Sequence, residues 1–485
     1  MLHRSPFGKR CATTKTQQPC QCLTKPLPLC ANLKKKTSQF KAVKLFRILF
    51  YESVKLLVRL VRWVYYAKRA TVNGGKVQHG GPCIIVSNHP GTLMDPLNTV
   101  VHMRRRIHFL ANASLFKTPF SDWFFTNFYC IKVERYVDTG GRPLNNKNSF
   151  RLATEHLTRG GCLYMAPEGG SFEGRQLHKL KTGPARIALN TEQANGFNLG
   201  LEILPVGLNY SNPSEFRSEL LTIFGEPVKV ASFKNDWEAD KIGAVRKLTA
   251  RIRQHLLDVL LATADEEEDK LLAKAEIILQ NDNPMPLFEH YQRAKDILRE
   301  IQNWRKGQPE KYSNLKALTT AYFNKIKKLR VSDEAFVKMQ HAGFKQNWPA
   351  FILTVVVAFP FFLLGYLSHF LPLMSTHQIC RRLYDDPVWA PTFKPLVGIV
   401  AYLLFIVLQT WLVYFFSKNT VVAAAYILVF FPAGLAAEWF IKKWKLFLEA
   451  RRICHLAKRN KKEVEAVVQL RKDILSSYSS VPRAN

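Results

Sequence analysis

Three uncharged stretches near the C-terminal end of the sequence constrain its fold more than any other feature. Residues 349–374, 396–416 and 420–437 contain no Asp, Glu, Lys or Arg over 26, 21 and 18 positions. A helix needs about 20 mainly apolar residues to cross the hydrocarbon core of a bilayer. We therefore expect an integral membrane protein whose membrane region, 349–441, contains segments at about 349–374, 396–416 and 420–440.

The charges around these stretches bear on the number of crossings. Basic residues gather both before the first stretch, within 325–345, and after the last, in a basic tail at 442–485. Positive flanks prefer the cytoplasmic side, yet three crossings would place the two flanks on opposite sides. The conflict disappears if one stretch does not cross, for example the first, which Pro360 and Gly365 interrupt and which would then be re-entrant. We therefore favour two or four crossings.

The net charge of the chain predicts a polyanionic partner. The 485 residues contain 70 Lys and Arg against 37 Asp and Glu, a formal net charge of +33. Such a balance is typical of proteins that bind nucleic acid or anionic lipid. The uncharged spans, and a sequence without a recognisable nucleic-acid motif, favour anionic membrane lipids and argue against nucleic acid.

The N-terminal part divides into a leader and a helix. Residues 1–40 lack periodicity and predict a disordered leader, or an over-extended start of translation. From 43 to 69, Lys and Arg recur at helical spacing among apolar residues, which predicts a basic amphipathic helix. We expect it in the membrane interface with its cations toward anionic headgroups; a surface helix packed on the next domain is the alternative. No signal-peptide-like run follows Met1, so we expect the hydrophilic front to stay cytoplasmic.

Strand-like runs alternate with helical patterns in the next part of the chain. The runs are 83–87, 107–111, 129–133, 162–166, 203–208 and 221–225. This alternation predicts an α/β domain at 75–235 with a mainly parallel sheet, and places chemistry in the loops at the strand ends. The pattern then becomes helical and charged, which predicts a helical accessory region at 236–345.

Cysteine spacing gives no sign of a metal site. The nine cysteines contain no C-x-x-C pair, the spacing typical of zinc and redox motifs. We therefore expect reduced, structural thiols and no bound metal.

The strongest local signal is the sequence SNHPGTLMDP at residues 87–96, directly after a strand-like run. A helix would place His89 and Asp95 about 240° apart around its axis, so the two can meet only through a turn. Pro90-Gly91 bends the chain, and Pro96 suits the first position of a helix with Asp95 as N-cap. The carboxylate can then hold one imidazole nitrogen while the other accepts a proton from an alcohol. The alternative is a plain helix cap beside a surface histidine.

Three further segments carry candidate binding groups. The sequence IKVER, 131–135, ends a strand with Arg135, a cation suited to phosphate; a surface ion pair is the alternative. The sequence APEGGSF, 166–172, follows another strand, and its glycines allow backbone amides to approach a ligand; a tight turn is the alternative. The sequence ILPVGLNY, 203–210, is most simply structural, and Pro205 suggests a sheet edge or a bend.

In this order and at these intervals, the four segments resemble the four blocks of the PlsC-type glycerolipid acyltransferases, enzymes that acylate glycerol 3-phosphate or lysophosphatidic acid. The resemblance covers about 80–227 and implies an α/β acyltransferase domain. It implies a catalytic pair, His89 and Asp95, and phosphate binding by Arg135. The remaining residues that it implies are Glu168, Gly169, Lys132 and Arg175 in substrate binding, and Pro205, Val206 and Gly207 in a structural or acyl-donor role.

Three positions depart from the family pattern. Five residues separate His89 from Asp95 instead of the usual four, a spacing that resembles a divergent branch including fungal-type glycerol-3-phosphate acyltransferases and related bacterial proteins. The third block lacks its usual arginine, so phosphate binding would depend on Arg135 or recruit Arg175, Lys179 or Lys181. The early glycine of the second block is replaced by Tyr129 or Cys130.

The resemblance implies transfer of a fatty acyl group from a thioester of coenzyme A or acyl carrier protein to a hydroxyl of glycerol 3-phosphate. The product is lysophosphatidic acid, and no cofactor besides the thioester co-substrate is expected. Because no Ser or Cys nucleophile accompanies His89, transfer is expected to be direct, with amides around 168–170 as oxyanion donors. Lysophosphatidic acid or dihydroxyacetone phosphate is the alternative acceptor. A catalytically silent, basic membrane scaffold is the alternative outside enzymes.

Overall fold

The computed structural model describes residues 28–77, 80–135, 142–143, 145–345 and 347–479. The chain divides into two units, Met1–Phe50 and Tyr51–Asn485, with the boundary inside helix α1 (Pro28–Tyr65). Helix α1 thus begins within the segment 1–40 predicted as a disordered leader, of which residues 1–27 lie outside the described residues. Pro28 suits the first turn of a helix, and the Ala, Leu and Lys residues that follow have high helix propensity.

The second half of α1 turns its cations toward the rest of its unit. The Lys55 ammonium donates to the Met103 carbonyl at 2.5 Å, Arg59 donates to the Val101 carbonyl at 3.4 Å, and Arg62 Nη2 lies 3.1 Å from His102 Nε2. Leu56, Leu60 and Trp63 are 56%, 57% and 59% exposed. The expectation that these cations point to lipid headgroups is therefore wrong, because polar groups of the 101–103 loop bind them. The apolar stripe faces outward instead.

The described residues form one mainly parallel sheet. Its strands are β1 (Tyr66–Val72), β2 (Cys83–Ser87), β3 (His108–Asn112), β4 (Cys130–Val133), β5 (Cys162–Met165), β6 (Glu202–Tyr210), β7 (Ser218–Phe224) and β8 (Val228–Lys229). Their order is β1-β7-β6-β2-β5-β3-β4, with β8 beside β6. Strands β2 to β6 pair in parallel, whereas β7 and β8 run antiparallel to β6. The predicted fold class is confirmed.

Strand β1 occupies residues that the sequence assigns to the end of a helix. It pairs in parallel with β7 at the sheet edge, Tyr66 opposite Ser218. The prediction fails here because the extended conformation of β1 depends on a partner far along the chain. Strand β2, by contrast, is buried along its whole length, as expected for a central strand with both faces covered.

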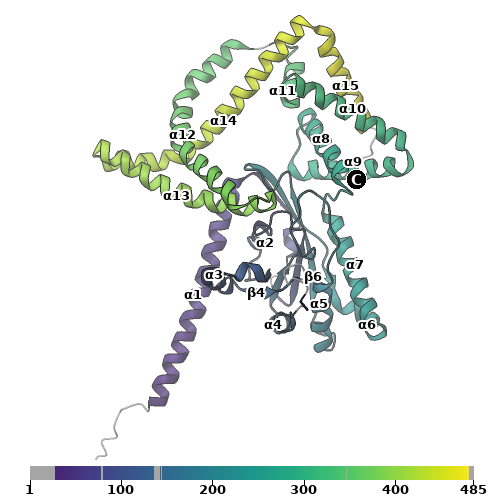
Figure 1. The fold of residues 1–485 in the computed structure, drawn as a ribbon, viewed down its shortest axis with the longest axis vertical. Helices are drawn as coiled ribbons and strands as arrows, with labels where there is room; N and C mark the ends of the chain where they lie inside the picture. Colours follow the sequence, from purple (N-terminus) through teal and green to yellow (C-terminus); the bar gives the residue numbers. More distant parts are fainter. Residues whose placement is uncertain (1–27, 78–79, 136–141, 144, 346, 480–485) are drawn as a thin grey trace, which may run out of the picture. The chain divides into compact units, whose positions relative to one another are not determined.

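The helices of this part of the chain are α2 (Met94–Val100), α3 (Pro119–Asn127), α4 (Lys147–Thr158), α5 (Gly183–Ala194), α6 (Lys234–Ala239) and α7 (Lys241–Val259). Four of them, α4 to α7, pack on the sheet to form the first hydrophobic core. Side chains of α4, α5 and α7 share this core with β2, β5 and β6, as Leu157, Leu189, Leu248 and Ile84 illustrate. Figure 1 shows α4, α5, α6 and α7 near the sheet.

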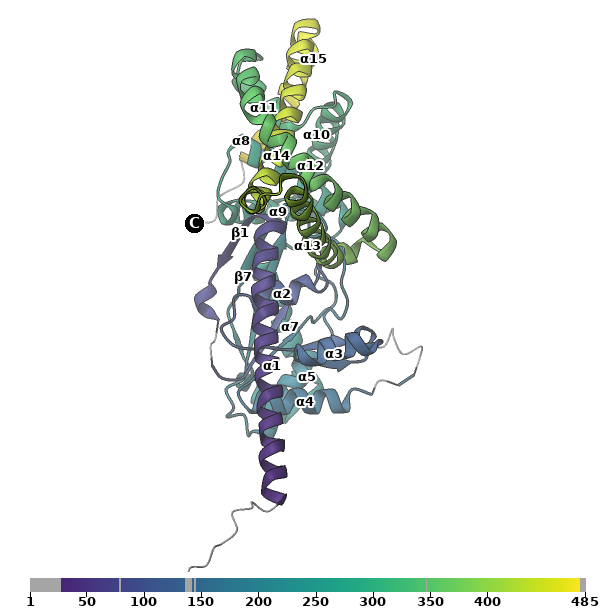
Figure 2. The same ribbon diagram turned by 90° about the vertical axis from the view of Figure 1, so that its left-hand side faces the viewer.

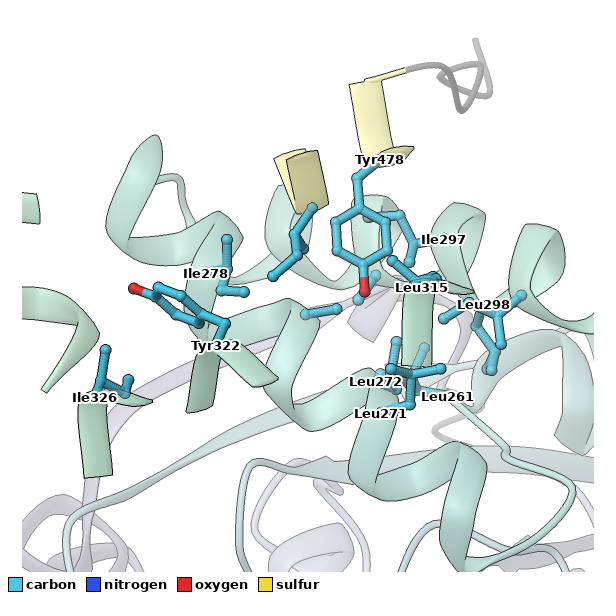
Figure 3. Packing of buried hydrophobic residues seen from close by; sticks show 14 of the residues in the cluster. Leu261, Leu271, Leu272, Ile278, Ile297, Leu298, Leu315, Tyr322, Ile326 and Tyr478 are labelled. Atoms are coloured by element: carbon cyan, nitrogen blue, oxygen red, sulfur yellow. The ribbon is translucent and has the colours of Figure 1, made fainter. Parts of the chain in front are cut away.

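A second core lies in the helical accessory region. Its helices are α8 (Glu266–Asp282), α9 (Leu287–Gly307), α10 (Pro309–Lys328), α11 (Asp333–His341) and α15 (Lys461–Ser479), which lie together in Figures 1 and 2. Tyr322, Ile278 and Tyr478 pack at its centre, as Figure 3 shows. Leu221 of β7 joins the same core, so the accessory helices are anchored to the sheet. The predicted basic tail thus contains a helix, α15, with a buried apolar face.

Three helices among the described residues are long and apolar enough to cross a membrane. They are α12 (Trp348–Leu383), α13 (Ala390–Ser417), preceded by the short helix η5 (Pro387–Trp389), and α14 (Thr420–Arg459). Helix α12 runs without a break through Pro360 and Gly365. A Cβ atom at Gly365 would collide with the Ala433 carbonyl of α14, so this glycine permits close helix packing and does not interrupt the helix.

Candidate active site

The loop after β2 brings His89 and Asp95 together. His89 Nδ1 lies 3.0 Å from Asp95 Oδ2; the imidazole is 20% exposed and the carboxylate is fully buried. Because a carboxylate accepts, Nδ1 carries the proton and Nε2 is left to act as a base. Asp95 lies inside the first turn of α2 and not at its N-cap as predicted. A turn with Met94 N–H donating to Gly91 O at 3.0 Å leads directly into the helix, so α2 begins earlier.

Asp95 is held by donors on both of its oxygens. The Gly91 N–H donates to Oδ2 at 2.6 Å, and the Tyr210 hydroxyl donates to Oδ1 at 2.6 Å. A Cβ atom at Gly91 would lie 2.7 Å from Oδ1, so this position requires glycine. Burial and the nearby charge of Asp95 raise the pKa of Tyr210 well above its ordinary value. Tyr210 therefore remains a protonated donor that fixes the carboxylate toward His89.

Sequence reasoning misses Tyr210 as a member of this site. Its hydroxyl also accepts from Asn98 Nδ2 at 2.9 Å, and the same amide donates to the Tyr66 hydroxyl at 3.1 Å. Tyr210 ends β6, whose pairing beside β2 brings it to Asp95. The only signal in the sequence is a tyrosine at the end of the fourth segment.

Glu168 connects the loop after β5 to the loop after β2. Its Oε1 accepts from the His89 N–H at 3.1 Å, and its Oε2 accepts from the His178 N–H at 3.0 Å. The side chain is 5% exposed, and burial raises the pKa of its carboxyl. Glu168 thus holds the backbone on which the catalytic histidine candidate sits. The adjacent Gly169 has a φ of 74°, a left-handed conformation that favours glycine.

The cationic candidates of the second block lie at the carboxyl end of β4. Arg135 Nη1 donates weakly to the Gly169 carbonyl at 3.4 Å, which places its guanidinium beside the loop that holds His89. The Lys132 ammonium lies 5.7 Å from the centre of the Phe116 ring. Because β2, β3, β4 and β5 are parallel, their carboxyl ends share one edge of the sheet. The structure thus brings Arg135 and Glu168 to the same edge as His89.

Arg175 is bound by the accessory region. Its guanidinium pairs with Asp269 at 3.3 Å and with Glu276 at 2.5 Å, both on α8, and the side chain is 16% exposed. A guanidinium between two carboxylates is poorly placed to bind phosphate as well. This environment disfavours the predicted substrate role and gives Arg175 a structural one.

The fourth block lies in the interior of the sheet. Strand β6 runs between β2 and β7, so the edge position suggested by Pro205 is wrong. Pro205 is tolerated because it lies between the segments of β6 that pair with β8 and with β7. Val206 is fully buried, and a Cβ atom at Gly207 would collide with the Val259 carbonyl of α7. These contacts favour a structural role for the block.

A residue of the membrane region touches the loop between His89 and Asp95. The Thr392 hydroxyl, at the start of α13, pairs with the Thr92 hydroxyl and accepts from the Leu93 N–H at 3.1 Å. Thr92 has a φ of 47°, an uncommon conformation for a β-branched residue. Thr392 therefore supports a strained turn of the site, which no local pattern in the sequence could reveal. Within the described residues, no group of three or more His, Cys, Asp or Glu is arranged to hold a metal ion.

Comparison with known proteins gives the identity of the front domain. Residues 69–209 match the family model described as Acyltransferase. These residues are an acyltransferase domain. The match contains His89, Asp95, Glu168 and Arg135, and its C-terminal end falls within β6.

Two curated relatives from Saccharomyces cerevisiae each match part of the chain. Glycerol-3-phosphate O-acyltransferase 1 is 34% identical over 123 residues, 24% of this chain and 16% of the yeast protein. Glycerol-3-phosphate O-acyltransferase 2 is 27% identical over 199 residues, 36% of this chain and 26% of the yeast protein. The chain thus spans about a quarter or less of these relatives. Among solved structures, the 1-acyl-sn-glycerophosphate (LPA) acyltransferase PlsC from Thermotoga maritima aligns with a TM-score of 0.32 and 19% identity, over 46% of this chain and 85% of that one.

Proposed function

We propose that this protein transfers a fatty acyl group from a thioester of coenzyme A or acyl carrier protein to a hydroxyl of glycerol 3-phosphate, giving lysophosphatidic acid. The observation that carries the proposal is the buried Asp95, held 3.0 Å from Nδ1 of a partly exposed His89 inside an acyltransferase domain. The names of the two yeast relatives support glycerol 3-phosphate as the acceptor.

In the proposed reaction, His89 is the general base. Its Nε2 takes the hydroxyl proton as the oxygen attacks the thioester carbonyl; the new C–O bond forms, and the C–S bond breaks as the tetrahedral intermediate collapses. The imidazolium then returns the proton to the leaving thiolate. Asp95 orients the ring and stabilises its positive charge. A base and an acceptor held in position account for a large part of such a rate enhancement.

The oxyanion of the intermediate needs donors close to His89. The Gly169 N–H already donates to the Ala166 carbonyl at 3.2 Å, which removes it from the predicted set of amides around 168–170. The amides of Glu168 and Gly170 remain the proposed donors.

The phosphate of the acceptor would bind to the cations at the end of β4. Arg135 lies beside the loop of Glu168 and Gly169, and Lys132 precedes it at the same sheet edge. A planar guanidinium can bind phosphate with two parallel hydrogen bonds.

We further propose that the membrane-bound protein contacts anionic lipids and that the domain faces the cytoplasm. No cofactor besides the thioester, and no metal ion, is part of the proposal.

Identifying the product tests this proposal. The purified protein in lipid nanodiscs is given palmitoyl-CoA with glycerol 3-phosphate, dihydroxyacetone phosphate or lysophosphatidic acid, and each product is identified by mass spectrometry. Lysophosphatidic acid formed from glycerol 3-phosphate, at a higher kcat/KM than either other reaction, is the expected result. Preference for another acceptor would reassign the substrate, and no transfer to any of the three would favour the scaffold alternative.

A further inference from the structure

A cavity of about 1000 Å³ adjoins the candidate active site. Asn88 and Pro90, the two neighbours of His89, line one part of it, and the other parts are lined by residues of β6, β7, α8 and α9 and of the loops after β5, β6 and α7. The helices α8 and α9 lie outside the matched domain at 69–209. The cavity is at the upper end of the size range of about 300–1,000 Å³ typical of small-molecule sites. The accessory region thus contributes one wall of a space beside the proposed base.

The wall of this cavity is hydrogen-bonded to Asn88, the residue before His89. The Asn88 side chain donates to the Leu208 carbonyl at 2.9 Å and accepts from the Leu208 N–H at 2.9 Å. Leu208 belongs to β6 and lines the cavity. The part of the cavity wall formed by Leu208 therefore has a fixed position relative to the backbone that carries His89.

The charges of the lining disfavour a phosphate-bearing ligand. Its acidic residues are Glu168, Glu173, Glu219, Glu266, Asp269 and Glu276, against the two cations Arg175 and Lys270. Arg175 is moreover paired with Asp269 and Glu276. Glycerol 3-phosphate is a small polyanion, so the cations at the end of β4 suit it better than this cavity does.

The apolar part of the lining suits a hydrocarbon chain. It includes Leu208, Leu221, Leu261, Ala273, Ile277 and Leu287. Ala273 and Ile277 are four residues apart on α8 and therefore share a face. Ile277 is 45% exposed, so a large apolar side chain lies uncovered on the face that lines the cavity.

Both the α8 wall and the rim of the cavity are held in place. The Arg175 ion pairs fix α8 to the loop after β5, and Leu271, next to the lining residues, is buried in the second core. Ser214, at the rim, accepts from the Lys394 ammonium at 2.6 Å through its carbonyl oxygen. The rim thus touches the first turns of α13, an apolar helix of membrane-spanning length. A lipid product leaving the cavity would be next to the membrane region.

From these observations we infer that the cavity binds the fatty acyl chain of the thioester, with Ala273 and Ile277 of α8 setting the chain length that fits. This inference rests on the proposed acyl transfer and adds to it the place of the donor chain. The thioester carbonyl would lie near His89, the chain would extend along α8, and the charged head of the donor would remain outside the cavity.

Binding of a non-transferable donor tests the inference without any turnover. S-hexadecyl-CoA and S-octyl-CoA, which are thioethers, are titrated calorimetrically into the full-length protein carrying Ala273→Phe or Ile277→Ala. The phenyl ring would occupy space that a long chain fills, so we expect Ala273→Phe to weaken hexadecyl binding about tenfold, or about 1.4 kcal/mol, and octyl binding less than about twofold. Ile277→Ala, titrated also with S-eicosyl-CoA, is expected to shift the preference from S-hexadecyl-CoA toward this longer thioether.

Matched substitutions away from the cavity serve as controls. Ala239→Phe, at the exposed end of α6, and Ile242→Ala, at an exposed position of α7, should leave both affinities unchanged. The inference is overturned if Ala273→Phe weakens both thioethers equally or neither of them, or if the wild type does not bind S-hexadecyl-CoA. Should Ala273→Phe unfold, the chain-length shift of Ile277→Ala decides alone. The expected chain-length dependence of thioether binding, in a wild type that acylates no acceptor, would overturn the proposed function. It would not overturn the inference that the cavity binds an acyl chain.

Discussion

At the scale of single residues, the candidate site depends on how Asp95 is fixed. Gly91 and Tyr210 each donate to one of its oxygens, so the buried carboxylate keeps one orientation toward His89. The sequence could predict the pair itself, because six residues and a Pro-Gly turn bring it together. It could not predict Tyr210, which strand pairing brings to Asp95, or the neutralisation of Arg175 by α8, which depends on packing between distant segments.

Removing the Tyr210 hydroxyl should impair catalysis with little change in substrate binding. We expect Tyr210→Phe to lower kcat about tenfold and to leave the KM for the acceptor within about twofold, since the lost bond positions Asp95 and does not touch substrate.

Steady-state kinetics and thermal unfolding, measured beside a control, check this prediction. Tyr414→Phe, at a position 44% exposed on α13, should leave kcat and KM unchanged. A loss of activity in Tyr210→Phe that comes with a several-fold higher KM for the acceptor, or with a lower unfolding temperature, would indicate a general structural role for the hydroxyl and contradict its role in positioning Asp95.

At the scale of secondary-structure elements, the helical and strand-like patterns of the sequence located most helices and strands. Which face of an element packs, and where the element ends, depended on the segments that it contacts. Helix α1 was expected to turn its cations to lipid, yet Lys55, Arg59 and Arg62 bind the 101–103 loop. A helical pattern shows that two faces differ; it does not show which one packs. Strand β1 was missed for a related reason, since β7 provides its hydrogen-bonding partner.

The outward apolar stripe of α1 should hold the acyltransferase domain against the membrane surface, while the three long apolar helices keep the protein in the bilayer. We expect replacement of Leu56, Leu60 and Trp63 by Ser to reduce activity on anionic vesicles about tenfold, because each exposed apolar side chain inserted into the interface adds to the free energy that holds the domain there. Activity in detergent micelles should change less than about twofold. Initial rates in the two media measure the two effects, with Ile242→Ser on α7 as the control. Equal loss of activity in both media would show that the stripe acts within the fold.

At the scale of the whole molecule, the membrane region and the acyltransferase domain are joined at the site. Thr392 supports the turn between His89 and Asp95, and Arg217 pairs with Glu438 of α14 at 3.2 Å. The uncharged stretches correctly located three long apolar helices, because length and lack of charge suffice for that, although α12 and α14 extend beyond the predicted segments. The contact of their first turns with the loop of the site could not be predicted, since it depends on the tertiary arrangement.

Loss of the Thr392 hydroxyl should therefore lower catalysis, although Thr392 lies far from His89 and Asp95 in the sequence. We expect Thr392→Val, which nearly preserves the shape of the side chain, to lower kcat about threefold to tenfold and to cost roughly 1 kcal/mol of stability, because it leaves the Leu93 N–H without its acceptor. Thr420→Val, at an exposed position at the start of α14, is the matched control. Unchanged kcat in nanodiscs would mean that the turn holds its conformation without the membrane region.

The most direct test of the central claim is the initial rate of lysophosphatidic acid formation from palmitoyl-CoA and glycerol 3-phosphate, compared between the wild type and His89→Ala in nanodiscs. If His89 is the base and Asp95 orients it, His89→Ala should lower the rate at least about a thousandfold, and Asp95→Asn should lower it comparably. Thermal unfolding should confirm that both variants remain folded. A folded His89→Ala variant that forms the product at the rate of the wild type would contradict the assignment of His89 as the base.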